Sequence, residues 1–481
     1  MENAAKVMQA EGLPVTMQEI SALDRLIRVV KERKDRPFAG DFNQFERELG
    51  ERLREVGREI LQSELAKADI DCEAVLIDGT EHRQVLRSPE TYMTTMGRVT
   101  VERTLYKDRT DPGARAVAAT EARLGIIGGF WTPEAGKQAA WVVSQMTPAL
   151  AEELFGRVGN MSPSTSSLGR LPSHLHGAWE DDRKAFEAEL RAVTVIPEGT
   201  ASLAVSLDGV LIPMRDGGAV ETRERAAREG RTSQGPAGYR EASCATISFC
   251  DSDGDLISAI RTARMPEFKK RTLKASLLLE LRSIWEQHPE LPVVKLADAA
   301  KDNWDFLGRE VPVGDDLVDY FHATEHLNHA LAAAYGDGTR ETRFRFEELK
   351  VILRDDEGGV DRVIASLRYL RDKHPRRKVL ERELTFFRRN RQRMRYWEFV
   401  EKGLPIGSGV VEAACKTLVA HRLKQSGMRW AHEGGQGILT TRGWSQSGRF
   451  DQAWALLAAT FQVQVTILNN VIAISAARKS R

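Results

Sequence analysis

The sequence has few cysteines and no segment typical of protein export. Only four of its 481 residues are cysteines, and none of them stand at the spacing of zinc ligands. This scarcity argues against a disulfide-stapled or zinc-ribbon protein and favours a reducing compartment. The first 15 residues also lack the apolar core of a signal peptide. We therefore expect a cytoplasmic protein.

Long apolar runs are missing as well. The longest apolar tract, residues 453–475, is interrupted by Thr, Gln and Asn, so we expect a buried helix there rather than a membrane span. No internal repeat or low-complexity tract occurs. The length predicts two or three domains. The apolar and charged fractions, 42% and 29%, are those of a soluble globular protein.

A formal net charge of only +1 conceals one strongly basic segment. Residues 376–395 hold nine lysines and arginines against two glutamates, with aromatic residues interleaved. Such a helix suits phosphate neutralisation with stacking against bases. We predict a helix over residues 376–399 that faces DNA through Arg388, Arg389, Arg391, Arg393 and Trp397. The alternative is a solvated helix face with no role in nucleic-acid binding.

The first half of the chain reads as helices, then strands, then helices. Residues 1–68 show helical periodicity, and the amphipathic helix over residues 42–65 is available for dimerisation. Strand signals fill residues 70–110. Residues 148–171 resemble helix, turn, helix, with Ser162 as the cap of the second helix. This motif either reads DNA in the major groove or is a pair of packed helices without that role.

From residue 197 onward the pattern becomes a mixed α/β one. Strands are expected at 201–213, 239–250 and 255–265, then a helix, then strands at 291–298 and 316–321. A helical stretch follows over about 322–404. This order predicts a mixed sheet interrupted by an all-helical insertion.

Three acids fall where such a sheet binds ligands. Asp208 and Asp298 end two predicted strands, and Glu412 starts a helix after a Gly-Ser-Gly turn. Three carboxylates placed in this way can hold a pair of Mg²⁺ ions for phosphoryl transfer. The alternatives are a turn residue for Asp208, a helix cap for Asp298, and for Glu412 an i,i+4 partner of Lys416.

Three sequence stretches resemble a known family. SLDGVLIPMRD (206–216), KLADAAKDNW (295–304) and GSGVVEAACKTLVAHRLKQSGMRW (407–430) are similar to the acidic motifs of bacterial insertion-sequence transposases of the Kra type. The resemblance covers about residues 85–460 and implies an RNase H-like DDE catalytic core. It assigns catalysis and metal binding to Asp208, Asp298 and Glu412. The separation of 114 positions between the second and third acids implies an inserted helical domain.

The resemblance also implies partners and further site residues. Asp319 and His322 match a C/D-x-x-H signature that shapes the site in several transposase groups. The basic residues around Glu412 are expected to hold the DNA backbone; they are Lys416, Arg422, Lys424 and Arg429. The implied substrates are transposon terminal inverted repeats and target DNA, bound by a homodimer or a larger synaptic complex at the bacterial nucleoid, away from any membrane. The implied cofactor is two Mg²⁺ ions, for which Mn²⁺ can substitute.

The expected protein is therefore an α/β (mixed) protein with a mainly helical N-terminal region. Its predicted parts are residues 1–110, a helix-turn-helix-like region at 111–196, and an RNase H-like domain at 197–481 with the insertion at about 322–404. The expected activity is DNA cleavage at transposon ends followed by strand transfer. The alternatives are a catalytically silent DNA-binding protein derived from a transposase and an RNase H-like nuclease without strand transfer.

Overall fold

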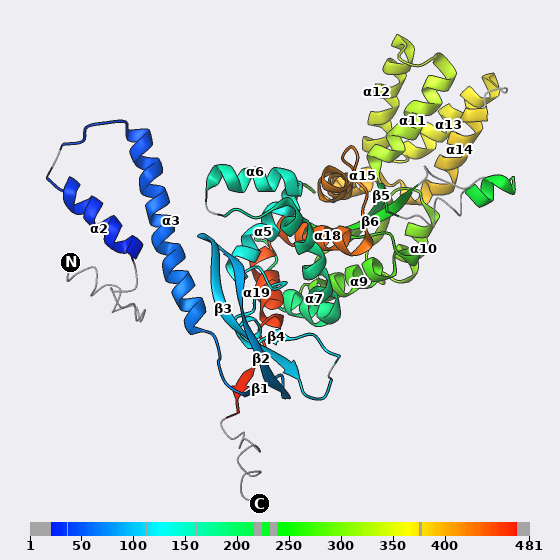
Figure 1. Ribbon diagram of the computed structural model, residues 1–481. Coiled ribbons are helices and arrows are strands. Elements are labelled where there is room, and N and C mark those ends of the chain that lie inside the picture. Colours follow the sequence, from blue (N-terminus) through cyan, green and yellow to red (C-terminus); the bar gives the residue numbers. More distant parts are fainter. Residues whose placement is uncertain are drawn as a thin grey trace, which may run out of the picture. The chain divides into compact units, whose positions relative to one another are not determined.

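The computed structural model describes residues 21–35, 37–111, 113–159, 161–215, 224–230, 238–374 and 378–468. It is a mixed α/β structure with two five-stranded sheets (Figure 1). The chain forms two compact units, one of Met1–Ala178 with Trp454–Arg481 and one of Trp179–Ala453. Within the described ranges, no helix has both the length and the apolar character that a membrane crossing requires.

The first unit contains the predicted N-terminal helices and a curved antiparallel sheet. The helices α2 (Ser21–Arg33) and α3 (Phe42–Lys67) confirm the helices expected after residue 20, whereas residues 1–20 of that prediction lie outside the described residues. The sheet has the order β10-β1-β2-β3-β4. Its strands are β1 (Ala74–Ile77), β2 (Thr80–Thr94), β3 (Gly97–Asp108), β4 (Val117–Ala118) and β10 (Val465–Ile467). Its further helices are α4 (Ala119–Leu124) and α5 (Pro133–Gln145).

Residues 461–468 do not continue the buried helix predicted over 453–475, and the remainder of that prediction, 469–475, lies outside the described residues. The helix α19 (Phe450–Thr460) ends early, and β10 then pairs antiparallel with β1. The strand β1 has an edge whose backbone groups need partners, and β10 supplies them. Strand β10 therefore belongs to the first unit, and the compact units divide the chain elsewhere than at the predicted residues 110 and 196.

The predicted helix pair around residues 148–171 is present, with a different cap. The helices are α6 (Pro148–Val158) and α7 (Thr165–Ala192). The hydroxyl of Ser164, not that of Ser162, accepts a hydrogen bond from the Ser167 N–H at 3.2 Å. Ser164 directly precedes the helix, so its hydroxyl reaches the free N–H groups of the first turn. The role of this pair in reading DNA stays a prediction.

The second unit is built on a sheet of order β7-β6-β5-β8-β9. The strands are β5 (Ser202–Pro213), β6 (Tyr239–Cys250), β7 (Leu256–Arg264), β8 (Val293–Ala297) and β9 (Asp315–Val318). The first three pair antiparallel, whereas β8 and β9 lie parallel to β5. The connecting helices are α9 (Arg271–Gln287) and α10 (Lys301–Arg309). The strand predicted at 316–321 ends at Val318, because Asp319 begins the next helix.

Alternation along β5 separates its two faces. Leu203, Val205 and Leu207 are buried in a core that also contains the leucines of α9. Successive side chains of a strand point to opposite faces, so Asp208 lies on the other face. Helix α16 (Gly409–Ala414) and the turns that follow it pack against β5 and β6.

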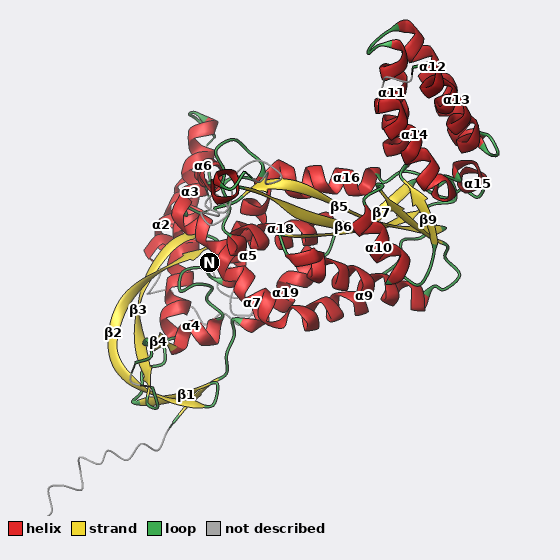
Figure 2. Ribbon diagram, turned by 90° about the vertical axis from the view of Figure 1, so that its right-hand side faces the viewer, coloured by secondary structure: helices red, strands yellow, loops and turns green. Residues whose placement is uncertain are grey.

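Four helices form the predicted insertion between β9 and α16. They are α11 (Tyr320–Tyr335), α12 (Arg340–Asp355), α13 (Gly359–Lys373) and α14 (Lys378–Asn390). Figures 1 and 2 show these helices side by side at one end of the sheet. One buried cluster continues from the sheet into this bundle.

The single basic helix predicted over residues 376–399 is broken. Helix α14 ends at Asn390, a 3-10 turn covers Arg391–Arg393, and α15 covers Tyr396–Glu401. Met394, only 2% exposed, and ion pairs from Arg393 and Arg395 to β9 hold this segment against the sheet. These contacts turn the chain away from the direction of α14.

Candidate active site

Three aspartates stand level where the parallel pairing of β5, β8 and β9 ends. The pairing of β5 with β8 ends two residues before Asp208 and Asp298. The pairing of β8 with β9 ends one residue before Asp298 and Asp319. The carboxyl edge of a parallel sheet is where ligands bind in α/β proteins. Asp208, Asp298 and Asp319 therefore form a row across that edge.

The sequence predicted Asp208 at the end of a strand, but Asp208 lies within β5. Antiparallel pairing with β6 carries the strand on to Pro213 and places Cys244 opposite Asp208. The half-buried carboxylate accepts the Gly209 N–H at 2.7 Å and is hydrogen-bonded by the thiol of Cys415. Burial, and then the charge of Asp298, raise the pKa of Asp208 above its ordinary value.

Asp298 follows β8 directly and is held by three hydrogen bonds. Its Oδ1 accepts from the Ala300 N–H at 3.1 Å and from Asn303 Nδ2 at 3.0 Å. Its carbonyl oxygen accepts from Trp304 Nε1 at 2.6 Å. The guanidinium of Arg393 lies 4.5 Å from the centre of the Trp304 ring. Arg393 therefore helps to hold the indole that positions Asp298.

Glu412 lies on α16 at the edge of an apolar stripe. The residues of this stripe are buried: Val411, Cys415, Leu418, Val419 and Leu423. Glu412 itself is exposed, and its Oε1 accepts from Ser408 Oγ at 3.4 Å. Among the described residues no ion pair joins Glu412 to Lys416. Partial removal of water, then the charges of Asp319 and Asp208, raise the pKa of Glu412.

A π-helical segment, Cys415–Ala420, follows α16 and leads into α17 (His421–Leu423). Arg442, on α18 (His432–Gln446), donates from Nε to the Leu418 carbonyl at 2.9 Å and from a second nitrogen to the Thr417 carbonyl. Short π-helical segments occur often at functional sites. Arg442 thus supports the helix that carries Glu412 by binding carbonyl groups in the irregular segment.

Asp319 joins the start of the insertion to the turn before Glu412. Its Oδ1 accepts the His322 N–H at 2.6 Å, and its Oδ2 accepts the Ser408 N–H. Asp319 is 1% exposed. A Cβ on Gly407 would lie 2.7 Å from a ring carbon of Phe321, so this glycine permits the close approach of the two segments. The spacing of Asp319 and His322 in the sequence is consistent with the helix cap. Nothing in the sequence indicated the contact between Asp319 and Ser408.

The acids influence one another electrostatically, but their side chains do not form a group that could hold a metal ion. Asp298 raises the pKa of Asp208, and Asp208 raises that of Glu412. Within the described ranges, no three His, Cys, Asp or Glu side chains are close enough together to hold a metal ion. The expected convergence on one metal pair is therefore not seen. Like charges repel, which disfavours a close approach of the three carboxylates.

Three of the four basic residues predicted around Glu412 are exposed, namely Lys416, Lys424 and Arg429. Arg422 is different, because it is 2% exposed and lies 5.0 Å from the centre of the Trp430 ring. Burial, and then the nearby Arg442, lower the pKa of Arg422 to about 10. The prediction of Arg422 as a DNA-binding side chain is wrong, since its guanidinium is enclosed by the protein.

The predicted basic face of the insertion divides into two groups. Arg388 and Arg389 are exposed, and no ion pair of either is found within the described residues. Arg391 instead pairs with Asp361 at 2.5 Å, and Arg393 pairs with Asp316 at 3.3 Å. Trp397 is half-buried. Arg391 and Arg393 are therefore engaged within the protein, whereas Arg388 and Arg389 are available to an external anion.

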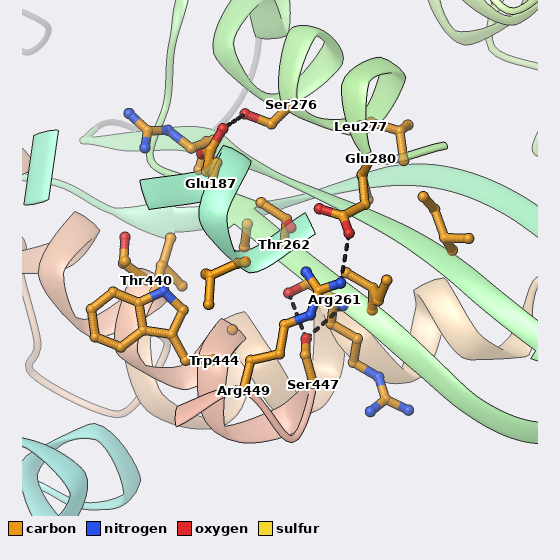
Figure 3. Close-up of a pocket in the computed structure, with 18 of the residues that line it drawn as sticks. Glu187, Arg261, Thr262, Ser276, Leu277, Glu280, Thr440, Trp444, Ser447 and Arg449 are labelled. Carbon is orange, nitrogen blue, oxygen red and sulfur yellow. Dashed lines mark hydrogen bonds and ion pairs between the residues drawn. The ribbon is translucent and has the colours of Figure 1, made fainter. Parts of the chain in front are cut away.

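A cavity of about 80 Å³ lies on the other face of the sheet, between β6, β7, α7, α9 and α18 (Figure 3). Its charged groups are already paired: Arg449 binds Glu280 at 2.6 Å, and Ser276 donates to Glu187 at 2.9 Å. This volume admits a few water molecules and no nucleotide. None of the acidic row lines it. We therefore assign it a structural role.

No protein-family model and no curated protein matches the chain. Among solved structures, the Drosophila P element transposase strand transfer complex is similar to it with a TM-score of 0.26 and 11% sequence identity. The similarity covers 68% of this chain and 81% of that one. A TM-score of this size does not define a shared fold.

Proposed function

We propose that this protein is a DNA transposase of the DDE type, related to the Kra-type insertion-sequence enzymes. The observation that carries the proposal is the level placement of Asp208 and Asp298 on neighbouring parallel strands. Glu412 joins them from a helix packed on the same sheet, and its pKa responds to Asp208. Three acids that are far apart in sequence thus share one electrostatic environment.

The topology of the second unit supports an RNase H-like core. Its first strand, β5, lies at the centre, with an antiparallel hairpin on one side and two parallel strands on the other. This is the strand arrangement of an RNase H-like sheet. The helices of the insertion stand between the strand after Asp298 and the helix of Glu412, where the long sequence spacing requires them.

The donor chemistry fits two Mg²⁺ ions held by Asp208, Asp298 and Glu412, with Mn²⁺ as a substitute. Carboxylate oxygens are hard ligands, and Mg²⁺ binds few of them together with phosphate and water. Burial, and then neighbouring negative charge, raise the pKa values of Asp208 and Glu412, and a cation would offset that charge. When bound, such ions stabilise the charge on the attacking and leaving oxygens of phosphoryl transfer.

The remaining side chains would bind and orient DNA. The exposed Lys416, Lys424 and Arg429 follow Glu412 in sequence and would hold the backbone of a DNA strand near the acids. Arg388 and Arg389 would extend this contact onto the insertion. The substrates would be the terminal inverted repeats and target DNA, and assembly of two ends would require a homodimer or a larger synaptic complex.

The test is a strand-transfer assay. The terminal repeats are read from the DNA that flanks the gene, and a labelled duplex ending in that repeat with a free 3′-hydroxyl is incubated with protein, Mg²⁺ and a target plasmid. We expect covalently joined product that EDTA abolishes. A target plasmid that is nicked but not joined to the labelled duplex would indicate an RNase H-like nuclease without strand transfer. Binding without either reaction is the result of a silent DNA-binding protein, and both outcomes overturn the proposal.

A further inference from the structure

Two histidines on α11 face each other through the same ring nitrogen. His322 and His326 stand one turn apart, so their side chains share one face of the helix. Their Nε2 atoms are 3.3 Å apart, and their ring planes cross at 83°. Their side chains are 31% and 25% exposed, so solvent reaches both.

A buried carboxylate determines which nitrogen of His326 carries the proton. Nδ1 of His326 lies 2.5 Å from Oε2 of Glu383, whose side chain is fully buried. Burial alone would raise the pKa of Glu383, but hydrogen bonds from His326 and Arg382 outweigh it and lower that pKa. An ionised carboxylate only accepts, so Nδ1 of His326 donates, and in the neutral ring Nε2 keeps its lone pair.

The surroundings hold both rings in place. The His326 ring stacks on Phe386 with centroids 3.6 Å apart and planes 15° apart. Nδ1 of His322 faces Oε2 of Glu325 at 3.8 Å. Each imidazole thus turns its Nδ1 toward a carboxylate and its Nε2 toward the other ring. Metal-binding histidines usually show this pattern, in which the second nitrogen donates to a carboxylate.

We propose that His322 and His326 form a binding site for a divalent transition metal of the Zn²⁺ class, with Glu383 as the residue that orients His326. Two nitrogens at ~2.0–2.1 Å from a tetrahedral Zn²⁺ are roughly 3.3–3.4 Å apart, which matches the Nε2 separation. Because no group of three candidate ligands is found in the described part of the chain, water or an oxygen ligand would complete the coordination.

This site differs in chemistry from the carboxylate row. Imidazole nitrogen suits Zn²⁺, Cu²⁺ and Ni²⁺, whereas carboxylate oxygen suits Mg²⁺ and Mn²⁺. The proposal does not depend on the proposed function, since it concerns metal binding alone. The competing explanation is a direct N–H···N hydrogen bond, in which Nε2 of His322 donates to Nε2 of His326.

Calorimetric titration of the full-length, metal-stripped, tag-free protein with Zn²⁺ separates these explanations. We expect one Zn²⁺ per chain at this site, bound at least tenfold more weakly by His322→Ala and by His326→Ala. Glu383→Gln should weaken binding by ~10- to 100-fold, as loss of an orienting carboxylate does. His329→Ala is the matched control, because this exposed histidine lies on the same helix and should leave the affinity unchanged.

Circular dichroism verifies that each variant is folded. Glu383 is fully buried, so its variant is the one most at risk. His322 is partly exposed, and His322→Gln provides a substitution that keeps a polar side chain of similar length. Equal Zn²⁺ affinity in the wild type and in both His322 variants overturns the proposal, as does a wild-type protein that binds no Zn²⁺. The contact between the rings is then the hydrogen bond alone.

Discussion

The carboxylate of Asp319 accepts a hydrogen bond from the main-chain N–H of Ser408, 89 residues further along the chain. The same carboxylate caps α11 through the His322 N–H. Asp319 therefore connects the end of β9 with the turn that begins α16. The position of Glu412 depends on this connection, although Asp319 is not among the three proposed metal ligands.

Replacing Asp319 with Asn should lower both stability and cleavage. The amide keeps one acceptor oxygen for two N–H donors, and its NH₂ group would face a donor. Leaving a buried N–H without a partner costs about 1–3 kcal/mol, which chemical denaturation would measure. Cleavage should fall more than DNA affinity, because α16 loses its anchor. Asp315→Asn, at the exposed start of β9, is the control; it weakens only an exposed ion pair with Arg395 and should cost less than about 1 kcal/mol. Equal stability of the two variants would contradict the role of Asp319.

Replacing Glu412 with Gln should abolish cleavage while the fold survives. The change keeps the volume but removes the charge that holds a hard cation. We expect cleavage of a transposon-end duplex in Mg²⁺ to fall by at least about 100-fold, with unchanged DNA affinity in a gel-shift assay. Glu310→Gln, an exposed glutamate after α10, is the control and should cleave normally. A Glu412→Gln protein that cuts at the wild-type rate would exclude Glu412 from the catalytic set.

The raised pKa of Asp208 predicts a pH-dependent gain on its removal. A carboxyl group whose pKa is higher in the folded state contributes stability below its unfolded pKa, about 3.9, and loses it as pH rises through the folded pKa. In EDTA, Asp208→Asn should therefore unfold at a higher urea concentration than the wild type near pH 7, with the gain shrinking toward pH ~4. Added Mg²⁺ should stabilise the wild type more than the variant. A variant that is less stable near pH 7 in EDTA would contradict the crowding of charge at this site.

Replacing Arg388 and Arg389 together with Ala should weaken DNA binding and its salt dependence. Each lost phosphate contact lowers the slope of log affinity against log salt by ~0.9, so the double variant should lose about two units. Arg391→Ala is the control, since Arg391 already pairs with Asp361 and should change the slope less. Fluorescence anisotropy over a range of salt concentrations provides both values. An unchanged slope in the double variant would assign these arginines to a solvated surface.

Local periodicity predicted much of the second unit. The strand expected over residues 201–213 is β5, and the helix expected at Glu412 is α16, because both patterns depend on side chains close in sequence. The row formed by Asp208 and Asp298 was expected from the strand ends, although β5 continues past Asp208 through its pairing with β6.

What local patterns missed depends on contacts between distant residues. Arg422 was predicted to bind DNA because of its charge, but its guanidinium lies over the Trp430 ring and is buried. The helix break after Asn390 accompanies an ion pair from Arg393 to Asp316, 77 residues earlier. The periodicity of one segment cannot predict a contact with a residue so far away in the sequence.

The insertion leaves and rejoins the sheet of the second unit at nearly the same point, since the Tyr320 N–H donates to the Ile406 carbonyl at 3.0 Å. The two ends of the insertion are therefore held together by a main-chain hydrogen bond, and the helices between them form a closed loop on the core. The entropic cost of closing a flexible loop rises by only about 0.6 kcal/mol for each doubling of its length. The insertion can thus become longer or shorter, or be exchanged, while the hydrogen bond between its ends keeps Glu412 in place. Relatives of this protein should differ most in the number of residues between Tyr320 and Ile406.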